Sequence, residues 1–526
     1  MDNNVNNIPI EKFQFATRND LYHDSKFETK PVSYFQGAFQ RFSKNKGAVV
    51  GGIVIAVLVL FAILAPFFTP FKPAYYDMVY AYVTPKLDLF ANSNIDFWDG
   101  CRDKETNLIG YLKDRALAEE TGREVIKNGE YEVSDDGSTY SYRYDTYYGV
   151  GFGKYKTISP EEFKKIQEYQ NETGRQVLYP VVKAADRPTL EKNKYDANIY
   201  YKVENPKASI LRPKVDKNGA IIPNYWKYEA SDPSSLVAEY NSLRIEGENG
   251  FEEKGKQYLY AYGRKVDGGI EVRTEYYEYY TYRHSEVLKD GVGEPLFLFG
   301  TTETGKDIFA CLAYGARFSF IFATIVAIAN FTVGVVWGSI SGYSGGKIDL
   351  FMERFAEILG AVPSYIVITL LKYHMGSSSQ VLVLFIAFFA TGWIGMASTT
   401  RMQFYRFKNQ EYVLAARTLG ARDMRIMFKH IFPNGLGTIV TSVALIIPSM
   451  IYSETNLSYL GIINLEAGNT TSVGTLIAAG QKSIMANAGY VALFPCVFLI
   501  LLMLSFNLFG NGLRDAFNPS LRGTED

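Results

Sequence analysis

The sequence contains few of the residues that bind metals or form disulfides. Only three cysteines and four histidines occur among its 526 residues. Cys101, Cys311 and Cys496 lie far apart, without the short spacings of zinc sites or disulfide frameworks. The histidines are equally scattered. The sequence therefore predicts no metal site, and a fold that is stabilised by packing rather than by cross-links.

The chain also lacks an excess of charge and an apolar run near its start. It has 54 Lys and Arg against 55 Asp and Glu, a formal net charge of -1. This balance argues against a nucleic-acid binder, because such proteins attract phosphates through a strongly basic surface. The first forty residues are polar and contain acids, unlike a cleaved signal peptide.

Long apolar segments are present instead. Residues 48–68 carry no charged side chain, and about 20 apolar residues in a helix cross a hydrocarbon core of ~30 Å. Residues 358–371 are a shorter stretch between Glu357 and Lys372, whose ammonium group can reach the membrane interface. Six spanning helices are therefore predicted, at residues 48–68, 318–343, 358–371, 381–400, 435–453 and 488–507.

Lys and Arg cluster beside alternate ends of these segments. They precede the first span, lie between the second and third, and are most frequent between the fourth and fifth. Because cytoplasmic loops are enriched in Lys and Arg, both termini are predicted to be cytoplasmic. The predicted parts are a cytoplasmic segment 1–47, a first span 48–71, an extracellular insert 72–297, a five-helix part 298–515 with a cytoplasmic loop 401–433, and a cytoplasmic tail 516–526.

The insert 72–297 is rich in charge and holds 28 of the 39 tyrosines. Asn-Gly and Asp-Gly pairs at Asn128, Asn218 and Asp267 are typical of hairpin turns. Residues 159–174 begin with a capping serine and an early proline and end at a glycine, which predicts a helix. The insert is therefore predicted to be a folded α+β domain.

A short motif occurs twice in the insert. Residues 120–126 read ETGREVI, and residues 172–178, which begin 52 positions later, read ETGRQVL. In both copies a helix-like run ends at a glycine and a strand-like run follows. A local duplication and a coincidence of helix-stop residues both explain this pattern.

Four tyrosines near the end of the insert are candidates for docking of a partner protein. Tyr276, Tyr277, Tyr279 and Tyr280 follow a run of β-formers. In a strand, adjacent residues face opposite sides, so some rings would point outward. Exposed tyrosines suit protein interfaces. The alternative is that these rings pack on the sheet.

Residues 300–307, GTTETGKD, resemble a phosphate-binding loop. Asp307 stands where such a loop has the Ser or Thr that binds magnesium. The predicted topology also places this segment outside, away from cytoplasmic ATP. No other motif of this kind occurs in the sequence. We therefore expect no cofactor on this chain, and ATP and magnesium on partner subunits.

The loop between the fourth and fifth spans has a distinctive sequence. Residues 411–434 read EYVLAARTLGARDMRIMFKHIFPN. Ala415 and Ala416 are small and permit another surface to approach closely, and Gly420 can end the helix that contains them. A short helix, a bend and a second helix are therefore predicted on the cytoplasmic side.

This loop resembles the coupling loop of ABC importer membrane subunits. That pattern has paired alanines, a glycine four residues later and a downstream Ile-x-Pro, which residues 431–433 supply here. The glutamate usual just before the alanines is replaced by Leu414. The resemblance implies that an ATPase subunit docks on Glu411, Ala415, Ala416, Gly420, Ala421, Arg422 and Asp423.

The wider sequence is similar to the C-type membrane subunit of dipeptide and oligopeptide permeases. This resemblance implies a mainly α membrane protein with six transmembrane helices of the type I ABC importer fold. The extracellular α+β insert between helices one and two departs from the family's short outer loop. The resemblance is carried by residues 32–73, 299–307, 343–346, 363–364, 454–461 and 507–515.

The same resemblance implies the partners and the mechanism. In this family two membrane subunits pair above two ATP-binding subunits, and an extracellular solute-binding protein or lipoprotein delivers the solute. The chain would then be a multi-pass permease subunit of a bacterial cell membrane that carries peptides and is not itself an enzyme. Closure of the ATPases would move the spans through the coupling loop, as a rigid-body transition.

Within the spans, Glu454 is the notable acid, because an intramembrane carboxylate usually faces a cavity or a partner. It is a candidate for contact with the amino terminus of a peptide, or for holding a helix end. Pro363, Trp393 and Asn456 are further candidates for the translocation pathway.

Other functions stay open at this point. Related permeases carry nickel, glutathione or oligosaccharides, although His374 and Cys496 are too isolated for a soft-metal site. A different class is a membrane-anchored sensor or enzyme built around the insert. That class needs a catalytic constellation or a cytoplasmic signalling domain, and the sequence has no clear motif for either.

Overall fold

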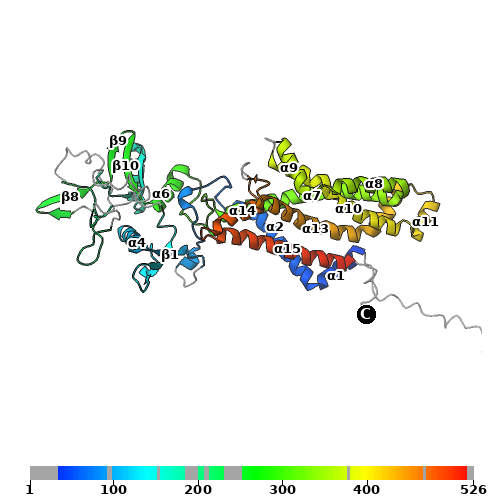
Figure 1. The fold of residues 1–526 in the computed structure, drawn as a ribbon, viewed down its shortest axis with the longest axis horizontal. Helices are drawn as coiled ribbons and strands as arrows, with labels where there is room; N and C mark the ends of the chain where they lie inside the picture. Colours follow the sequence, from blue (N-terminus) through cyan, green and yellow to red (C-terminus); the bar gives the residue numbers. More distant parts are fainter. Residues whose placement is uncertain are drawn as a thin grey trace, which may run out of the picture.

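The computed structural model describes residues 34–91, 97–150, 154–183, 200–205, 212–229, 251–375, 379–465 and 470–517. Two parts lie end to end in an elongated molecule (Figure 1). We call residues 34–71 and 298–517 the helical domain, and residues 72–297 the inserted domain. Most of the predicted N-terminal segment and tail, residues 1–33 and 518–526, lies outside the described residues.

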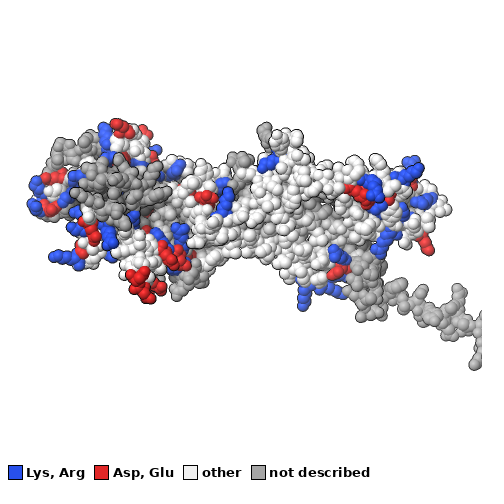
Figure 2. All heavy atoms as spheres, in the orientation of Figure 1, with Lys and Arg blue, Asp and Glu red and all other residues white. Residues whose placement is uncertain are grey.

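Among the described residues, five helices are long and apolar enough to cross a membrane. Each contains, or nearly contains, one of the predicted spans. Figure 2 shows a band with little charge between the inserted domain and the far end of the helical domain, as a membrane-spanning region requires. The five helices are α2 (Lys46–Phe68), α7 (Ile308–Ser344), α10 (Gln380–Phe407), α13 (Phe432–Tyr459) and α15 (Tyr490–Phe517).

The segment of the predicted span at residues 358–371 is broken in the structure. α8 (Gly346–Gly360) ends and α9 (Ser364–Met375) begins within this segment, and the two helices are bent by 71°. Pro363 lies at the break. A proline disfavours helical backbone at the residue before it, which explains why α8 does not continue through this segment. Only when taken together are these two helices long and apolar enough to cross a membrane, as one broken span. The described residues therefore contain five or six spans.

Four shorter helices complete the helical domain. α1 packs against the end of α15, where the Arg41 Nε donates to the carbonyl oxygen of Ala516 (3.0 Å). α14 was not predicted, because its twelve residues are too few for a span; Ser472 and Thr475 form a capping box at its start. These helices are α1 (Tyr34–Lys44), α11 (Glu411–Thr418), α12 (Asp423–Arg425) and α14 (Val473–Ile484).

The inserted domain combines helices with three small antiparallel sheets. Their strand orders are β1-β3-β2, β4-β10-β5 with β9 also paired to β10, and β6-β8-β7. The strands are β1 (Cys101–Thr106), β2 (Glu132–Val133), β3 (Tyr140–Asp145), β4 (Lys154–Ile158), β5 (Leu178–Tyr179), β6 (Lys227–Glu229), β7 (Phe251–Glu253), β8 (Lys256–Tyr260), β9 (Gly263–Val266) and β10 (Gly269–Thr274). The helices are α3 (Asp88–Ala91), α4 (Leu108–Thr121), α5 (Pro160–Thr173) and α6 (Tyr276–Tyr282).

Most of the local signals in the inserted domain are confirmed. The Ser159 side chain accepts from the Glu162 N–H at the start of α5, and the helix ends at Gly174. The turn at Asp267 joins β9 to β10. Asn128 has the positive φ of a hairpin turn (56°), but the strands on either side of it do not pair with each other, since both pair with β3 or its end.

The repeated motif belongs to a larger structural repeat. β1 and α4 are followed, 52 residues later, by β4 and α5, as the bounds 108–121 and 160–173 of the two helices show. Both helices end at a glycine in the left-handed conformation, Gly122 (φ 67°) and Gly174 (φ 71°). The preference for glycine at the ends of helices explains this similarity by itself, without a duplication of the segment.

The pairing that follows extends the match beyond local chemistry. The Asp145 N–H, at the end of β3, donates to the Val125 carbonyl (2.9 Å), and the Glu275 N–H, after β10, donates to the Val177 carbonyl (3.1 Å). Residues 180–262 separate the two halves of the second copy. The shared register of strands distant in sequence favours duplication over coincidence.

The two domains meet through hydrogen bonds and aromatic rings. The Thr301 N–H donates to the carbonyl of Val83 (2.9 Å), and the Trp98 indole donates to that of Leu298 (2.6 Å). Phe299 stacks on Phe494 of α15, with ring centroids 4.0 Å apart. The inserted domain is therefore seated on the ends of α7 and α15.

Candidate coupling surface and pathway residues

α11 and α12 form the end of the helical domain opposite the inserted domain (Figure 1). After α11 the chain turns at Gly420, whose N–H donates to the carbonyl of Arg417 (3.0 Å). Gly420 has a φ of 78°, which a side chain with a Cβ disfavours. The predicted short helix, bend and second helix are therefore confirmed.

The residues predicted to contact an ATPase lie on one exposed element. Two large apolar side chains beside them are also exposed, Leu419 to 89% and Met424 to 65%. Small and apolar groups on an exposed turn are typical of a surface that a partner covers. Glu411, Ala415, Gly420, Arg422 and Asp423 are exposed, and Ala416 and Ala421 are half-buried.

A compact cluster of buried apolar side chains connects this surface to the rest of the helical domain. Val413 of α11 is buried with Ile426, Met427 and Ile431, which follow α12, and with Phe404 near the end of α10. Side chains interlocked in this way transmit displacement, because packed interiors deform little. A force on α11 is therefore passed to α10 and α13.

Tyr343, at the end of α7, adds a polar anchor that the sequence reasoning did not single out. Its hydroxyl donates to the Asp423 carboxylate (2.5 Å) and accepts from the Arg417 guanidinium (3.4 Å). The candidate coupling surface is thereby connected to α7 as well. The available signal was its place in the segment 343–346 that carries part of the family resemblance.

A second polar anchor joins three helices near the same end. Both carboxylate oxygens of Asp349 on α8 accept from Arg401 on α10, at 2.6 and 2.7 Å. The Tyr405 hydroxyl also donates to Asp349 (2.5 Å), and the Ser341 hydroxyl on α7 donates to it as well. Such bidentate pairs are geometrically specific. Residues 52 positions apart gave no local sequence signal for this contact.

The four predicted pathway residues do not gather in one cavity. Pro363 is exposed at the break between α8 and α9. Trp393 on α10 is buried against Trp337 of α7, with ring centroids 4.9 Å apart. Asn456 is half-buried on α13, and Glu454, two residues before it, points to a different side of that helix.

Glu454 is almost completely buried, with 1% of its surface exposed. Its carboxylate accepts from the hydroxyls of Ser472 (2.7 Å), Ser458 (2.9 Å) and Ser319 (3.4 Å). These donors come from the start of α14, from α13 and from α7. The geometry is that of a group which holds helices together, the second of the two roles considered from the sequence.

The four tyrosines predicted as a docking surface are not exposed. Tyr276, Tyr277, Tyr279 and Tyr280 lie on α6, not on a strand, and all four are buried. Their hydroxyl groups contact other residues of the inserted domain; that of Tyr276, for example, donates to Asp77 (2.6 Å). Helical periodicity places the rings all around a buried helix, so the expectation of outward-facing rings is wrong.

The segment that resembles a phosphate loop lies immediately before α7. The Asp307 carboxylate caps this helix by accepting from the N–H groups of Phe309 (3.3 Å) and Ala310 (2.9 Å). The Thr301 hydroxyl donates to the carbonyl of Tyr80 (2.5 Å). The side chains that resembled a nucleotide site are thus engaged in joining the inserted domain to α7.

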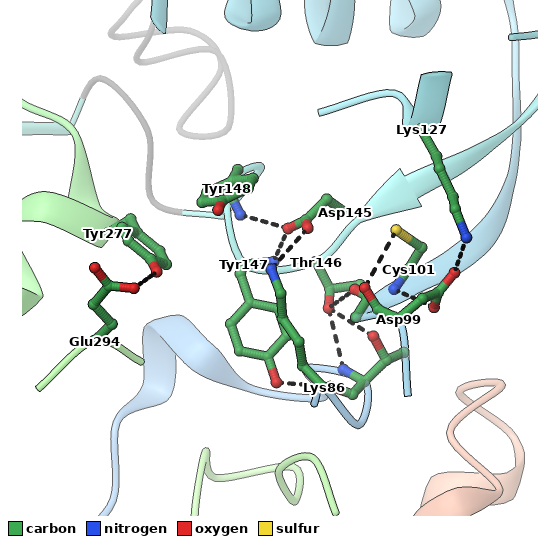
Figure 3. A network of polar contacts seen from close by, with 12 residues as sticks. Lys86, Asp99, Cys101, Lys127, Asp145, Thr146, Tyr147, Tyr148, Tyr277 and Glu294 are labelled. Atoms are coloured by element: carbon green, nitrogen blue, oxygen red, sulfur yellow. Dashed lines mark hydrogen bonds and ion pairs between the residues drawn. The ribbon is translucent and has the colours of Figure 1, made fainter. Parts of the chain in front are cut away.

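A network of charged groups lies in the inserted domain close to this junction (Figure 3). Asp145 accepts from the N–H groups of Tyr147 (2.7 Å) and Tyr148 (2.9 Å) and pairs with Lys86 (3.3 Å). Burial raises the pKa of Asp145, and Lys86 opposes this shift. Because these charged groups are paired with one another, the network has a structural role.

The neighbouring cavity, of ≈ 260 Å³, is lined in part by Cys101. Burial raises the pKa of its thiol to about 12, with Asp145 and Asp99 adding to the shift. Because the thiolate is the nucleophilic form, this thiol is unreactive at neutral pH.

Two family models match parts of the chain. Residues 334–523 match the inner membrane component of binding-protein-dependent transport systems. Residues 33–85 match the N-terminal transmembrane domain of oligopeptide transport permease C. Neither match includes residues 86–333, which contain most of the inserted domain.

Curated relatives agree with these matches. The chain is 42% identical over 224 residues to the oligopeptide transport system permease protein OppC of Bacillus subtilis, which is 43% of this chain and 72% of that protein. It is 39% identical to the dipeptide transport system permease protein DppC of the same organism, over 43% and 69%. It is 37% identical to the Escherichia coli OppC protein, over 43% and 72%.

A solved structure of the MetNI methionine ABC transporter in inward-facing conformations is also similar. The matched region covers 39% of this chain and 94% of the MetNI chain, with a TM-score of 0.33 and 14% sequence identity.

Proposed function

Because this chain belongs to the family of C-type permease subunits of oligopeptide and dipeptide ABC importers, we propose that it forms half of the membrane path by which short peptides enter a bacterial cell. The exposed surface of α11, Gly420 and α12 is the observation that carries this proposal. It has the paired alanines, the glycine bend and the rigid support that transmission of motion from an ATPase requires.

The proposed topology places the inserted domain outside the cell and both termini inside. Residues 1–47 and 516–526 are then cytoplasmic, residues 72–297 are extracellular, and α8 and α9 form the third, broken span of a six-helix type I importer fold. The position of the inserted domain and α11 at opposite ends of the molecule supports this orientation (Figure 1). The enrichment of Lys and Arg around α10 and α11 supports it as well.

The proposed assembly has one further membrane subunit and two ATP-binding subunits. The ATP and magnesium belong to those ATPase chains, one of which grips the surface formed by Ala415, Ala416 and Gly420. An extracellular solute-binding protein, anchored as a lipoprotein, delivers the peptide. In this arrangement the chain transports but catalyses no reaction.

The inserted domain serves as a rigid base on which the binding protein docks. Its junction with the helical domain supports this role, since a docking base must hold its position while peptide is handed over. The four tyrosines of α6 contribute by stiffening the domain from inside, because their rings are buried. The docking groups lie elsewhere on its charged outer surface (Figure 2).

Uptake measurements test the cargo. Labelled di- to hexapeptides, glutathione, nickel and an oligosaccharide are supplied to cells with and without this chain, and initial rates are compared. We expect loss of peptide uptake alone. Intact peptide uptake with loss of another solute would move the cargo to that solute, and no change for any solute would overturn the proposed function.

A further inference from the structure

The exposed faces of the spanning helices differ in composition. After Lys46, α2 has no charged residue, and its exposed large side chains are all apolar. A face of this kind matches the hydrocarbon interior of a bilayer. Its exposed members include Val50, Ile53, Val57, Leu60, Ile63 and Leu64.

α8 presents charges as well as apolar groups. The side chains of Arg354 and Glu357 are 67% and 51% exposed, and they form an ion pair with an N···O distance of 2.5 Å. Phe351 and Ile358 are exposed on the same short helix. This face is therefore unlike that of α2, although both belong to the helical domain.

The position of Glu357 makes its exposure costly in lipid. Asp349 marks the cytoplasmic end of α8, because it pairs with Arg401 near the end of α10. Glu357 follows eight residues later, about 12 Å further toward the middle of the membrane at 1.5 Å per residue. Charges at that depth cost several kcal/mol unless water or a partner surrounds them.

A cavity opens beside these charges. It has a volume of ≈ 370 Å³ and lies between α7, α8 and α10. Glu353 and Glu357 line it together with Trp337, Ser398 and Arg401. A space that is bounded by ionised side chains holds water more readily than an acyl chain.

We propose that this face of α8, with the adjoining cavity, lines the water-filled path of the peptide, whereas the exposed face of α2 meets lipid. The assignment rests on the proposed function for the identity of the solute. Its physical content, water at Glu357 and Ser398 and none at Val57, is independent of the cargo.

Cysteine accessibility tests the inference in membranes that contain the chain with its partner subunits. Cys101, Cys311 and Cys496 are first replaced by serine. Single cysteines are then introduced as Glu357→Cys and Ser398→Cys, and as Val57→Cys for the matched control, which is 57% exposed on α2. A charged, membrane-impermeant thiol reagent is added to inside-out vesicles, and the rate of modification is measured by mass shift.

We expect Glu357→Cys and Ser398→Cys to react at least about ten-fold faster than Val57→Cys, because the reagent and the thiolate both need water. Added transported peptide should slow the reaction at these two positions. Ser398→Cys changes one atom, so it keeps the test valid if Glu357→Cys fails to insert. Rates equal to that of Val57→Cys would overturn the inference, as would cross-linking to the second membrane subunit without reaction in water. Absence of peptide uptake by the unmodified chain would instead overturn the proposed function.

Discussion

Single residues set how closely partners can approach the coupling surface. Ala416 is half-buried, and Gly420 has a positive φ of 78° with nothing within 4 Å of the place where a Cβ would lie. The space around Gly420 is not filled by this chain, so a partner can approach it closely. The size of single side chains at these positions therefore decides how closely another subunit can approach.

A bulky side chain at Ala416 should block coupling without unfolding the chain. For Ala416→Trp we expect peptide uptake to fall about ten-fold or more, equivalent to about 1.4 kcal/mol of docking free energy. The amount of chain in the membrane should stay the same, as measured by immunoblot. Ala416→Ser is the matched control and should keep most of the uptake. Uptake by Ala416→Trp close to normal would contradict the coupling assignment.

Glu278 is a single residue on which the duplicated parts converge. Arg123 follows α4, Arg175 follows α5 at the equivalent position, and both form ion pairs with its buried carboxylate. For Glu278→Gln we expect the inserted domain to lose about 2 kcal/mol of stability, because two guanidinium groups lose their shared acceptor.

Limited proteolysis of the purified chain across a temperature series measures that loss. Glu168→Gln is the control, since Glu168 forms only an exposed pair with Lys164 (3.8 Å) and should cost under about 0.5 kcal/mol. Equal cleavage of both variants would show that Glu278 does not hold the two copies together.

Whole elements in the inserted domain repeat, and their ends should respond alike to the same change. α4 and α5 both stop at a glycine with positive φ, at Gly122 and Gly174, and neither glycine has a neighbour within 4 Å of a built Cβ. For Gly122→Ala and Gly174→Ala we expect similar losses of about 1 kcal/mol each, from backbone strain alone.

Gly293→Ala provides the control, because Gly293 also has open space around it but no positive φ. It should leave stability unchanged within about 0.5 kcal/mol. Thermal unfolding of the purified chain measures all three variants. A large difference between the two helix ends would mean that the copies no longer share one helix-stop geometry.

At the scale of the whole molecule, the inserted domain can be removed where its two ends meet. The Lys86 N–H donates to the carbonyl of Phe297 (3.1 Å), so a short glycine-containing turn can replace residues 88–295. We expect the shortened chain to reach the membrane and to bind its ATPase partners, measured by co-purification.

Delivery of peptide by the binding protein should be lost in that shortened chain. Peptide uptake at limiting concentrations of the binding protein measures this, and the full chain provides the reference. Undiminished uptake would contradict the role of the inserted domain as a docking base, while the permease assignment would stand.

Local patterns predicted much of the fold. The five long spans, the caps of α5 at Ser159 and Gly174, and the bend at Gly420 each depend on residues within a few positions of one another. The predicted coupling residues share one surface for the same reason, because they lie on a single short segment. The family resemblance of these segments is confirmed by the matching permeases.

The predictions that failed depend on contacts between distant residues. The tyrosines that were considered as strand residues lie on α6, where their rings fill a core with the segment around Tyr80 and with α5. The break at Pro363 is instead local, because a proline disfavours helical backbone at the residue before it, and a count of apolar residues does not register this effect. The exposure of a side chain is a property of its neighbours in space, so composition alone did not separate buried tyrosines from surface ones.

By itself, the sequence determined the apolar segments, the helix caps, the exposed bend at Gly420 and the family, because hydrophobic length and short motifs act locally along the chain. Only the tertiary structure decided the partners of Glu454, the meeting of Arg123 and Arg175 at Glu278, and the exposure of Glu357 beside a cavity. These features join residues that are far apart in the chain, and packing of whole helices and strands is what brings such residues together.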